Sequence, residues 1–524
     1  MLRILLVLLL AAASVPGQTA PAAEELARLN ALESRRAIQF CKRLAHGWLE
    51  QADPVSGLLP RNLRDSWFWN AKDCAADNLP FLLLTAFVTD DYHLKRQLLH
   101  VMEQEQRLTN RVGKLPDDFL FEAQGFRPGE PELGGLIFGA SEYAKDGLTP
   151  ITEWLGPGPW LDRMTELIDA IWERAPRASR FGNLPSDSVE VNGEMLQVTS
   201  RLYWLTGEDR YRQLVFRLTD HYFLENSILA ADRLRLDDHA CEIIGGLSEG
   251  YLVAARTDPE RWKRYREPMH AILDRVLGIG RNRAGLLYMD VNPRTGEILN
   301  DELTDNWGYN YNAFLTVAEI DGESRYRKAV EKVLGNLGQY TDYPWERNGA
   351  DGYADSIEGG INLLNRIPDE RGFRWVEESM RTLLARQGDD GIIEGWYGDG
   401  NSARTALMYA LWKTQGVTAA PWRGDLELGA ARGKDGALRL YLKAGRPWRG
   451  ALRFDRPRHR DFFHLPFDYA RINQFPEWFT VETGARYRLT VDGGEAVTLT
   501  GQDLLGYGMA LDAHQAILLT VRQD

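Results

Sequence analysis

Two carboxylic acids in this sequence stand where acid–base chemistry could be placed. Glu194 opens the apolar run Met195–Trp204, where a carboxylate must be paired or must face a cavity, because burying it bare is costly. Asp73 follows the aromatic run Trp67–Trp69 and precedes an apolar helix that starts near Leu79. Cleavage of a glycosidic bond needs one carboxyl group to donate a proton and a second group to activate water or attack the sugar. We therefore predict that Glu194 is the general acid/base and Asp73 its partner; stabilisation of Glu194 by the helix dipole is an equal alternative.

The adjacent residues Asp238 and His239 form a second acid–base candidate. They stand immediately before an expected helix, where a carboxylate beside an imidazole suits proton transfer. Capping of that helix by Asp238 is an equally weighted structural alternative. No second histidine stands at ligand spacing, so we predict neither a metal site nor a cofactor.

Aromatic and polar residues near expected helix starts are predicted to bind the sugar, because aromatic rings stack on sugar faces and polar edges bond to hydroxyls. The predicted substrate-binding residues are Trp67, Trp69, Asn70, Asp305, Trp307, Tyr309, Tyr353, Asp355 and Arg404. Trp69, Trp307 and Tyr309 are the expected stacking platforms. Arg404 suits a bidentate contact with a uronate carboxylate, and Lys145 is a further anion contact. For any single aromatic residue, packing in the core is the structural alternative.

The elements that must hold these residues are helical. Residues 23–418 carry repeated apolar stripes at helix-face spacing, such as Tyr211, Leu214, Leu218 and Tyr222. Short connectors of similar composition join them into αα-hairpins. About six hairpins that cannot bury a face alone must stack on one another. We predict a mainly α fold, an (α/α)6 toroid over residues 23–418, with the site in loops at one end of the ring.

The pattern changes after residue 418. Leu438, Leu440 and Leu442 alternate with polar residues, as do Ile517, Leu519 and Val521. Gly-rich turn signals separate such runs. Residues 419–524 are therefore predicted to form a small β-sandwich-like domain.

The N-terminal residues indicate the cellular location of the protein, and its overall charge limits its possible partners. Residues 1–22 combine a basic start, a short apolar run and small residues, which predicts a signal peptide and a secreted or periplasmic protein. An uncleaved anchor is the alternative, although the run is too short to span a bilayer, and no other stretch is long enough. The net charge of −13 argues against a nucleic-acid partner. Three cysteines exclude a disulfide scaffold.

The run from Glu194 to Tyr211 resembles a segment of the unsaturated glucuronyl hydrolases, which belong to the six-hairpin glycosidases. In that family a catalytic Asp precedes a Leu-Tyr-Trp helix end and a Thr-Gly-Asp connector, and Glu194 occupies the matching position here. Asp355 with Ser356, and Trp307 with Gly308, are similar to further motifs of the family. A helical toroid followed by a β-domain also looks like several polysaccharide lyases.

These observations lead to one expected function and several rivals. The leading expectation is an exported glycoside hydrolase that cleaves uronic-acid-containing or related glycans, with an oligosaccharide or polysaccharide as its partner. The main rival is a polysaccharide lyase in which His239 or Tyr309 serves as the base. A sugar epimerase and a non-catalytic glycan-binding protein complete the alternatives.

Overall fold

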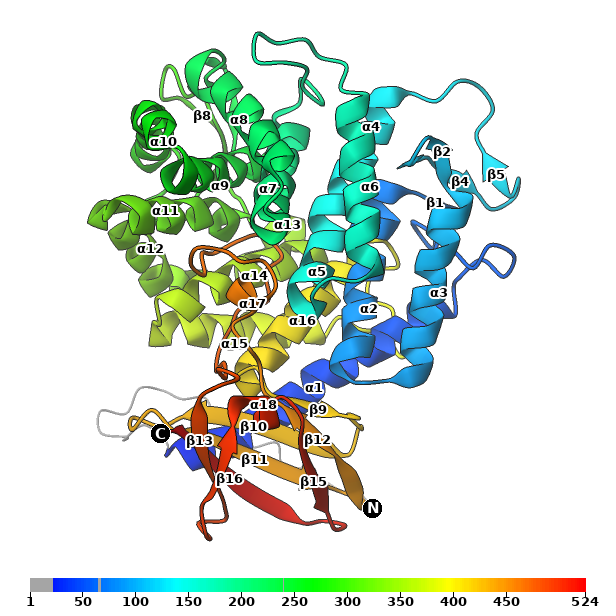
Figure 1. The fold of residues 1–524 in the computed structure, drawn as a ribbon, viewed down its shortest axis with the longest axis vertical. Helices are drawn as coiled ribbons and strands as arrows, with labels where there is room; N and C mark the ends of the chain where they lie inside the picture. The colour runs from blue at the N-terminus through cyan, green and yellow to red at the C-terminus, as the bar shows by residue number, and fades with distance from the viewer. Residues whose placement is uncertain (1–21, 65–66, 239) are drawn as a thin grey trace.

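The computed structural model describes residues 22–64, 67–238 and 240–524, and its larger part is a ring of helices (Figure 1). The inner segments, in order, are η1 (Ala71–Asn78) continued by α2 (Leu79–Val88), α4 (Leu133–Glu142) continued by η2 (Tyr143–Leu148) and α5 (Thr149–Leu155), α7 (Val189–Thr206), α9 (Cys241–Thr257), α11 (Trp307–Asp321), α14 (Ala350–Arg366) and α16 (Asp399–Thr414). Each packs on the next, and α16 closes the ring against η1 and α2. The expected toroid of helical hairpins is confirmed.

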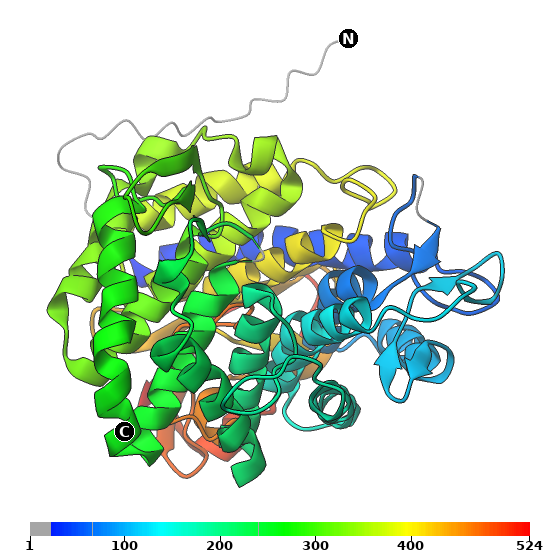
Figure 2. The ribbon, with the colours of Figure 1, turned by 90° about the horizontal axis from the view of Figure 1, so that it is seen from above.

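A second layer of helices surrounds the ring, as the view from above shows (Figure 2). The outer helices are α1 (Ala23–Leu49), α3 (Tyr92–Leu108), α6 (Pro159–Glu173), α8 (Asp209–Leu224), α10 (Pro259–Ile279), α12 (Ser324–Asn336) and α15 (Glu370–Leu384). They are amphipathic and bury one stripe against the ring, whereas the inner helices are buried on nearly every side.

Glycines let the inner helices approach each other closely near the start of α9. A Cβ at Gly193 of α7 would lie 2.5 Å from the backbone carbonyl carbon of Glu242 and from the backbone nitrogen of Ile243. A Cβ at Gly246 would lie 2.5 Å from the Gly193 carbonyl oxygen. The backbones of α7 and α9 therefore touch at this crossing, which brings the first turns of the two helices together.

Short hairpins and turns extend from the ring. They comprise the sheet of β1 (Phe68–Trp69), β4 (Phe119–Leu120) and β5 (Gly125–Phe126), the pair β2 (Asn110–Val112) and β3 (Leu115–Pro116), and the sheet of β6 (Leu234–Arg235), β7 (Tyr288–Val291) and β8 (Ile298–Leu303). The remaining short helices there are η3 (Ile228–Ala230), η4 (Leu337–Tyr340) and α13 (Trp345–Asn348).

The expected β-rich C-terminal domain is also present. Its larger sheet has the antiparallel order β10 (Leu426–Arg432), β11 (Leu438–Ala444), β16 (Ala516–Gln523), β13 (Arg486–Val491) and β14 (Val497–Thr500), and its smaller sheet the order β15 (Tyr507–Leu511), β12 (Trp448–Arg453) and β9 (Thr418–Ala420). The alternating leucines of β11 pair with the alternating apolar residues of β16, as in Leu440 opposite Leu519. A short helix α18 (Gly501–Leu504) follows β14.

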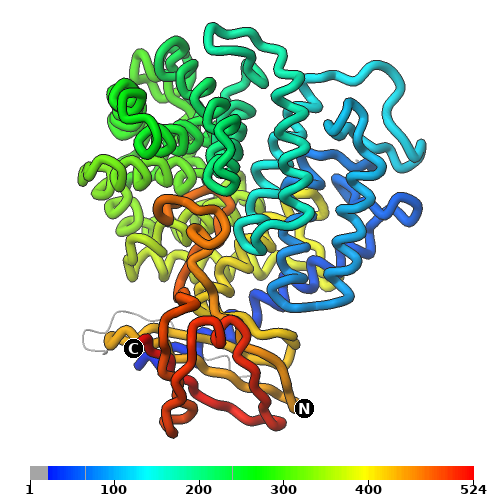
Figure 3. Tube along the Cα trace, in the orientation of Figure 1, coloured from blue at the N-terminus to red at the C-terminus, as the bar shows by residue number. Residues whose placement is uncertain are grey.

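One long excursion leaves this domain and enters the ring. Residues 456–479, here called the strap, connect β12 towards β13 and contain α17 (Arg458–Asp461). The orange tube in Figure 3 runs from the sheets up between the helices and back. A parallel bridge between Asp455 and Thr480 marks the base of the strap.

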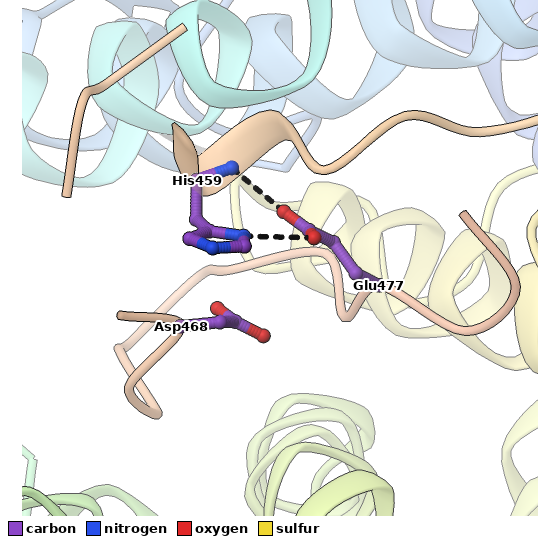
Figure 4. Close-up of side chains that lie close together, drawn as sticks. All are labelled: His459, Asp468 and Glu477. Carbon is purple, nitrogen blue, oxygen red and sulfur yellow. Dashed lines mark hydrogen bonds and ion pairs between the residues drawn. The ribbon is translucent and has the colours of Figure 1, made fainter. Parts of the chain in front are cut away.

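The two ends of the strap are fastened together by side chains (Figure 4). The backbone N–H of His459 donates to Glu477 Oε1 at 2.7 Å, and His459 Nδ1 lies 2.9 Å from Glu477 Oε2. Asp468 faces this pair but is neutralised by Arg366 and Arg471. The contact between His459 and Glu477 therefore joins the start of the strap to its end.

Two further predictions concern the chain as a whole. In the described residues, no helix combines the length and the apolarity that crossing a membrane requires. The predicted signal peptide falls almost wholly on residues 1–21, which lie outside the described residues, and it stays a prediction. Cys41, Cys74 and Cys241 are buried free thiols.

Candidate functional site

A cavity of about 510 Å³ lies inside the ring and has an acidic wall. Its charged lining residues are ten acids, Asp73, Asp77, Glu142, Asp146, Glu190, Asp238, Glu242, Glu346, Asp351 and Asp355, and four bases, Lys72, Lys145, Arg235 and Arg404. Its other lining residues are Phe138, Tyr309, Trp396, Tyr397, Asn401, Ile472 and Asn473. Asp238 and Glu346 are exposed, which places the mouth of the cavity at their end of the ring. Acidic side chains therefore outnumber basic ones in the wall of this cavity.

The first turns of the inner helices supply much of the wall. Glu190 belongs to the first turn of α7, Glu242 to that of α9 and Asp351 to that of α14. Tyr309 and Asn401 stand at the corresponding places of α11 and α16. The amino ends of helices carry partial positive charge, which favours carboxylates at these positions. The ring thus explains how so many acids are gathered around one space.

Two π-helical segments, which pack side by side, form another part of the wall. Segment η1 contributes Asp73 and Asp77, and segment η2 contributes Lys145 and Asp146. A π turn inserts an extra residue into a helix and is frequent at functional sites, because it re-aims side chains.

Asp73 of the cavity wall is held by a cation and by an amide donor. Arg61 Nε and Asn70 Nδ2 both donate to Asp73 Oδ2. The guanidinium of Arg61 also lies over the ring of Tyr397, 5.1 Å from its centroid. These contacts fix the position of the Asp73 carboxyl group in the cavity wall, where it can act as a base or nucleophile.

The carboxyl groups of Asp77 and Asp351 are buried among other acids. Burial and the negative charges of Asp146 and Glu142 raise the pKa of Asp77 well above its usual value. Burial and the charges of Asp355 and Glu346 do the same to the pKa of Asp351. Carboxyl groups in such surroundings hold their proton to a higher pH than usual and can act as proton donors.

Arg404 is held in a buried network at the inner end of the cavity. It forms ion pairs with Asp355 and with Glu358, whose Oε2 lies 2.7 Å from Arg404 Nε. The hydroxyl of Tyr309 donates to the same Glu358 oxygen at 2.6 Å, and Asn306 Nδ2 donates to Asp355 at 3.0 Å. Burial raises the pKa of Glu358 to about 7 even though Arg404 opposes the shift. The guanidinium is paired with both of these acids, and Arg404 is only 3% exposed.

Glu194 does not line the cavity but stands directly behind its wall. Glu194 is 1% exposed. One carboxylate oxygen of Glu194, one of Glu142 and one of Asp146 lie within 4.8 Å of one another. Burial and the charge of Glu142 raise the pKa of Glu194 well above its usual value. Lys145, paired with Asp146 at 2.8 Å and Glu242 at 3.0 Å, is the cation of this group.

Several residues predicted to bind sugar lie in the core instead of the cavity wall. Trp69 and Trp307 have no exposed ring face, and Trp307 Nε1 donates to Ser356 Oγ at 2.8 Å. The Tyr353 hydroxyl donates to the Tyr343 carbonyl at 3.3 Å. Asp305 is buried beneath the first turn of α11 and accepts from the Asn306 backbone at 3.1 Å.

The other predicted residues fall into three groups. Asn70 caps η1 with its side chain, and Trp67 is half exposed and packs edge-on against Phe121 away from the cavity. Asp73, Asp238, Tyr309, Asp355 and Arg404 do line the cavity. His239 lies outside the described residues.

Glu346 lies on an unusual backbone at the mouth of the cavity. Three consecutive residues, Glu346, Arg347 and Asn348, have positive φ angles of 43°, 54° and 70°. Left-handed backbone is unfavourable for such residues and persists where the surrounding structure demands it. Although Glu346 as a whole residue is exposed, its carboxyl group is partly desolvated by the cavity wall, and this desolvation together with the charges of Asp355 and Asp238 raises the pKa of Glu346 to about 7. No sequence signal pointed to this residue.

Comparison with known proteins gives likenesses among solved structures. No family model and no curated protein matches the chain. An α-1,6-mannanase of Salegentibacter sp. HEL1_6 is 12% identical with a TM-score of 0.39, over 71% of this chain and 98% of that one. The unsaturated glucuronyl hydrolase of Bacillus sp. GL1 is 12% identical with a TM-score of 0.37, over 53% and 85%.

A third structure, the cellobiose 2-epimerase of Spirochaeta thermophila DSM 6192, is 13% identical with a TM-score of 0.42, over 72% of this chain and 96% of that one. At these identities and TM-scores, no residue role or substrate carries over to this chain.

Proposed function

We propose that this chain is a carbohydrate-active enzyme, a glycoside hydrolase that cleaves its substrate in the acidic cavity. The observation that carries the proposal is the presence, in one cavity, of the carboxyl group of Asp73, fixed by an ion pair with Arg61, and of carboxyl groups whose pKa is raised by burial and by negative neighbours. Hydrolysis of a glycosidic bond requires one carboxyl group that donates a proton and a second that activates water or attacks the sugar.

Asp351 is proposed as the general acid and Asp73 as the base or nucleophile. They come from α14 and η1, two inner segments that both pack on α16. The charges of both acids, after burial, raise the pKa of Tyr397, so both act on the same part of the cavity. Asp351 would protonate the leaving oxygen, while Asp73 would take a proton from water or attack the sugar.

Glu194 is proposed to have an indirect role, without contact to the sugar. Because Glu194 lies behind the wall, it would act on Glu142 and Asp146 and not on the sugar itself. Burial and the charge of Glu142 favour the neutral form of the Glu194 carboxyl group, which would limit the negative charge of this group of three acids. Glu194 is therefore proposed as a positioning residue.

The aromatic platform for the sugar is proposed to be Trp396 with Tyr397. Both are partly exposed and line the cavity, and their ring centroids lie 4.3 Å apart at an interplanar angle of 73°. Trp396 Nε1 donates to Glu394 at 3.0 Å, which fixes the plane of the indole. A fixed indole face beside carboxyl groups suits a sugar ring with free hydroxyls.

The charge of the wall supports a neutral glycan over a uronate. Two of the four bases in the wall, Arg404 and Lys145, are each paired with two acids. Arg235 is paired with Asp237, and Lys72 lies over the ring of Phe138, 5.4 Å from its centroid. Because the wall holds ten acids and four bases, a further anion would meet more acids than bases. Elimination at a uronate is correspondingly less supported, because Tyr309 donates its proton to Glu358, and burial raises its pKa well above its usual value.

The test is an incubation of the protein, whose export we also propose from residues 1–22, with a panel of neutral and acidic glycans. Reducing ends are expected from neutral glycans without any rise in near-ultraviolet absorbance, whereas a lyase would produce both. Asp351→Asn and Asp73→Asn should each lower kcat by roughly 10²–10⁴-fold, the contribution of a general acid or base.

The matched control is Asp162→Asn, an exposed acid in the first turn of the outer helix α6. This variant should keep full activity. The assignment of the acid and base is refuted if Asp351→Asn or Asp73→Asn behaves like the control. Binding of a glycan without any change in its chain length would instead indicate a non-catalytic glycan-binding protein.

A further inference from the structure

The strap fills the end of the ring opposite the mouth of the cavity. Tyr469 donates to Glu249 of α9 at 2.8 Å, and Arg471 donates to Glu153 of α5 at 3.2 Å. On the far side of the ring, Arg366 at the end of α14 donates to Gln474 at 3.0 Å. Residues 469–474 are all buried. The strap therefore spans the interior of the ring from one wall to the other.

The tip of the strap forms the floor of the cavity. Ile472 and Asn473 are cavity-lining residues that come from the C-terminal domain. The Asn473 side chain donates to Asp146 and accepts from Arg404 at 2.9 Å, and its backbone N–H donates to Glu358 at 2.6 Å. Its φ of 59° is one that asparagine adopts more readily than most residues. One residue thus ties together three inner segments.

The depth of the cavity follows from helix α14. Asp351 and Asp355 line the cavity, while Glu358, in the next turn, contacts the strap. From residue 351 to residue 358 the helix axis rises by about 10 Å, at about 1.5 Å for each of the seven steps. The open part of the ring is therefore limited to the first two turns of the inner helices, and the remainder is filled.

We infer that the cavity is blind and takes the end of a glycan chain or a short oligosaccharide, so that the enzyme acts from chain ends. This inference rests on the proposed function for its chemistry. A polymer held at mid-chain needs a groove or channel with two exits, and the strap closes one exit with buried and hydrogen-bonded residues. The cavity has the size of sites that enclose one small ligand.

The decisive measurement is the product pattern on a long neutral glycan that the protein cleaves. Action from chain ends should release one small product from the start, while the remaining polymer shortens slowly and its viscosity falls little. A ladder of intermediate lengths with a rapid loss of viscosity would overturn the inference and leave the proposed function standing.

A second measurement remains decisive if no glycan is cleaved, which would refute the proposed function. Oligosaccharides of increasing length are titrated against the wild-type protein and the Asp351→Asn variant. A blind cavity predicts that affinity stops rising after the first few sugar units. Affinity that keeps rising with length, or no binding of any oligosaccharide, overturns the inference.

The role of the floor itself is tested with a matched pair of asparagine variants. Asn473→Ala removes the side-chain contacts with Asp146 and Arg404, and should raise KM for the chain-end substrate about 10-fold or more. Asn365→Ala removes a contact of the same strap outside the cavity, in which Asn365 Nδ2 donates to the Glu477 carbonyl at 3.0 Å. It should leave KM unchanged. Equal KM values for the two variants would show that the substrate does not reach the floor.

Discussion

The ion-pair network around Arg404 supports a prediction whose size can be worked out from the structure. Replacement of Arg404 by Met keeps most of the side-chain volume but removes the cation that faces Asp355 and Glu358. Breaking a buried pair by removal of one partner costs about 3–5 kcal/mol, because an uncompensated charge is left behind. The hydroxyl of Tyr309 and the Asn473 backbone still donate to Glu358, so we expect the lower end of this range.

The expected shift of the melting temperature follows from the size of the chain. The entropy of unfolding is about 2.1 cal/mol/K per residue, or about 1 kcal/mol/K for roughly 500 residues that unfold as one unit. A loss of about 3 kcal/mol then lowers Tm by about 3 °C. The loss should be larger at pH 8 than at pH 5.5, because burial raises the pKa of Glu358 to about 7, so that Glu358 is largely protonated at the lower pH and no longer needs the cation.

The assay is thermal unfolding of wild type, Arg404→Met and the double variant Arg404→Met/Glu358→Gln at both pH values. The double variant replaces an orphaned carboxylate by a neutral amide and should recover part of the lost Tm at pH 8. A single variant whose Tm at pH 8 lies within the error of wild type would refute the argument, because the network would then carry no net ionic contribution.

Four further outcomes are expected. Gly193→Ala should destabilise the protein by about 1–3 kcal/mol through overpacking against α9, while Gly278→Ala, where nothing lies within 4 Å, should be neutral or slightly stabilising in a urea titration. The free energy of unfolding should fall as pH rises through about 7, because the raised pKa of Glu358 makes the folded state hold a proton more tightly than the unfolded state; Glu358→Gln should flatten this slope. Trp396→Ala should raise KM with little loss of Tm, and an unchanged KM would exclude it as the platform. Trp307→Phe should lower stability by about 1 kcal/mol through loss of its hydrogen bond, with KM unchanged, and a raised KM would place it at the substrate after all.

The sequence predicted the ring well, because apolar periodicity reports which helices are buried whatever their final neighbours are. Acids near helix starts also proved to surround one cavity. The error in position was one helical turn. Helix α7 begins at Val189 and not near residue 195, so Glu190 occupies the first turn on the cavity wall and Glu194 lies one turn deeper.

The direction of an aromatic side chain was beyond sequence reasoning. Trp307 and Tyr309 stand two residues apart in the first turn of α11, yet Trp307 packs on Trp375 in the core and Tyr309 lines the cavity. Helix spacing predicts a face only when the axis position relative to its neighbours is known. The contact of Asn473 with the cavity could not be predicted for another reason. Asn473 lies 327 positions after Asp146, and no local sequence pattern indicates such a long-range contact.

Helix α1 has a consequence for how the chain folds. It packs against α16 and α2 of the ring on one side and against β10 and β11 on the other, and Asn30 Nδ2 donates to the Ala430 carbonyl at 2.8 Å, 400 positions away. Helix α1 can therefore pack on α2 early, but its partners α16, β10 and β11 are synthesised only near the end of the described chain. Such long-range contacts slow folding, because the entropy of closing a long loop is lost before the contacts form. The same shared helix couples the two domains, so we expect them to melt in a single cooperative transition.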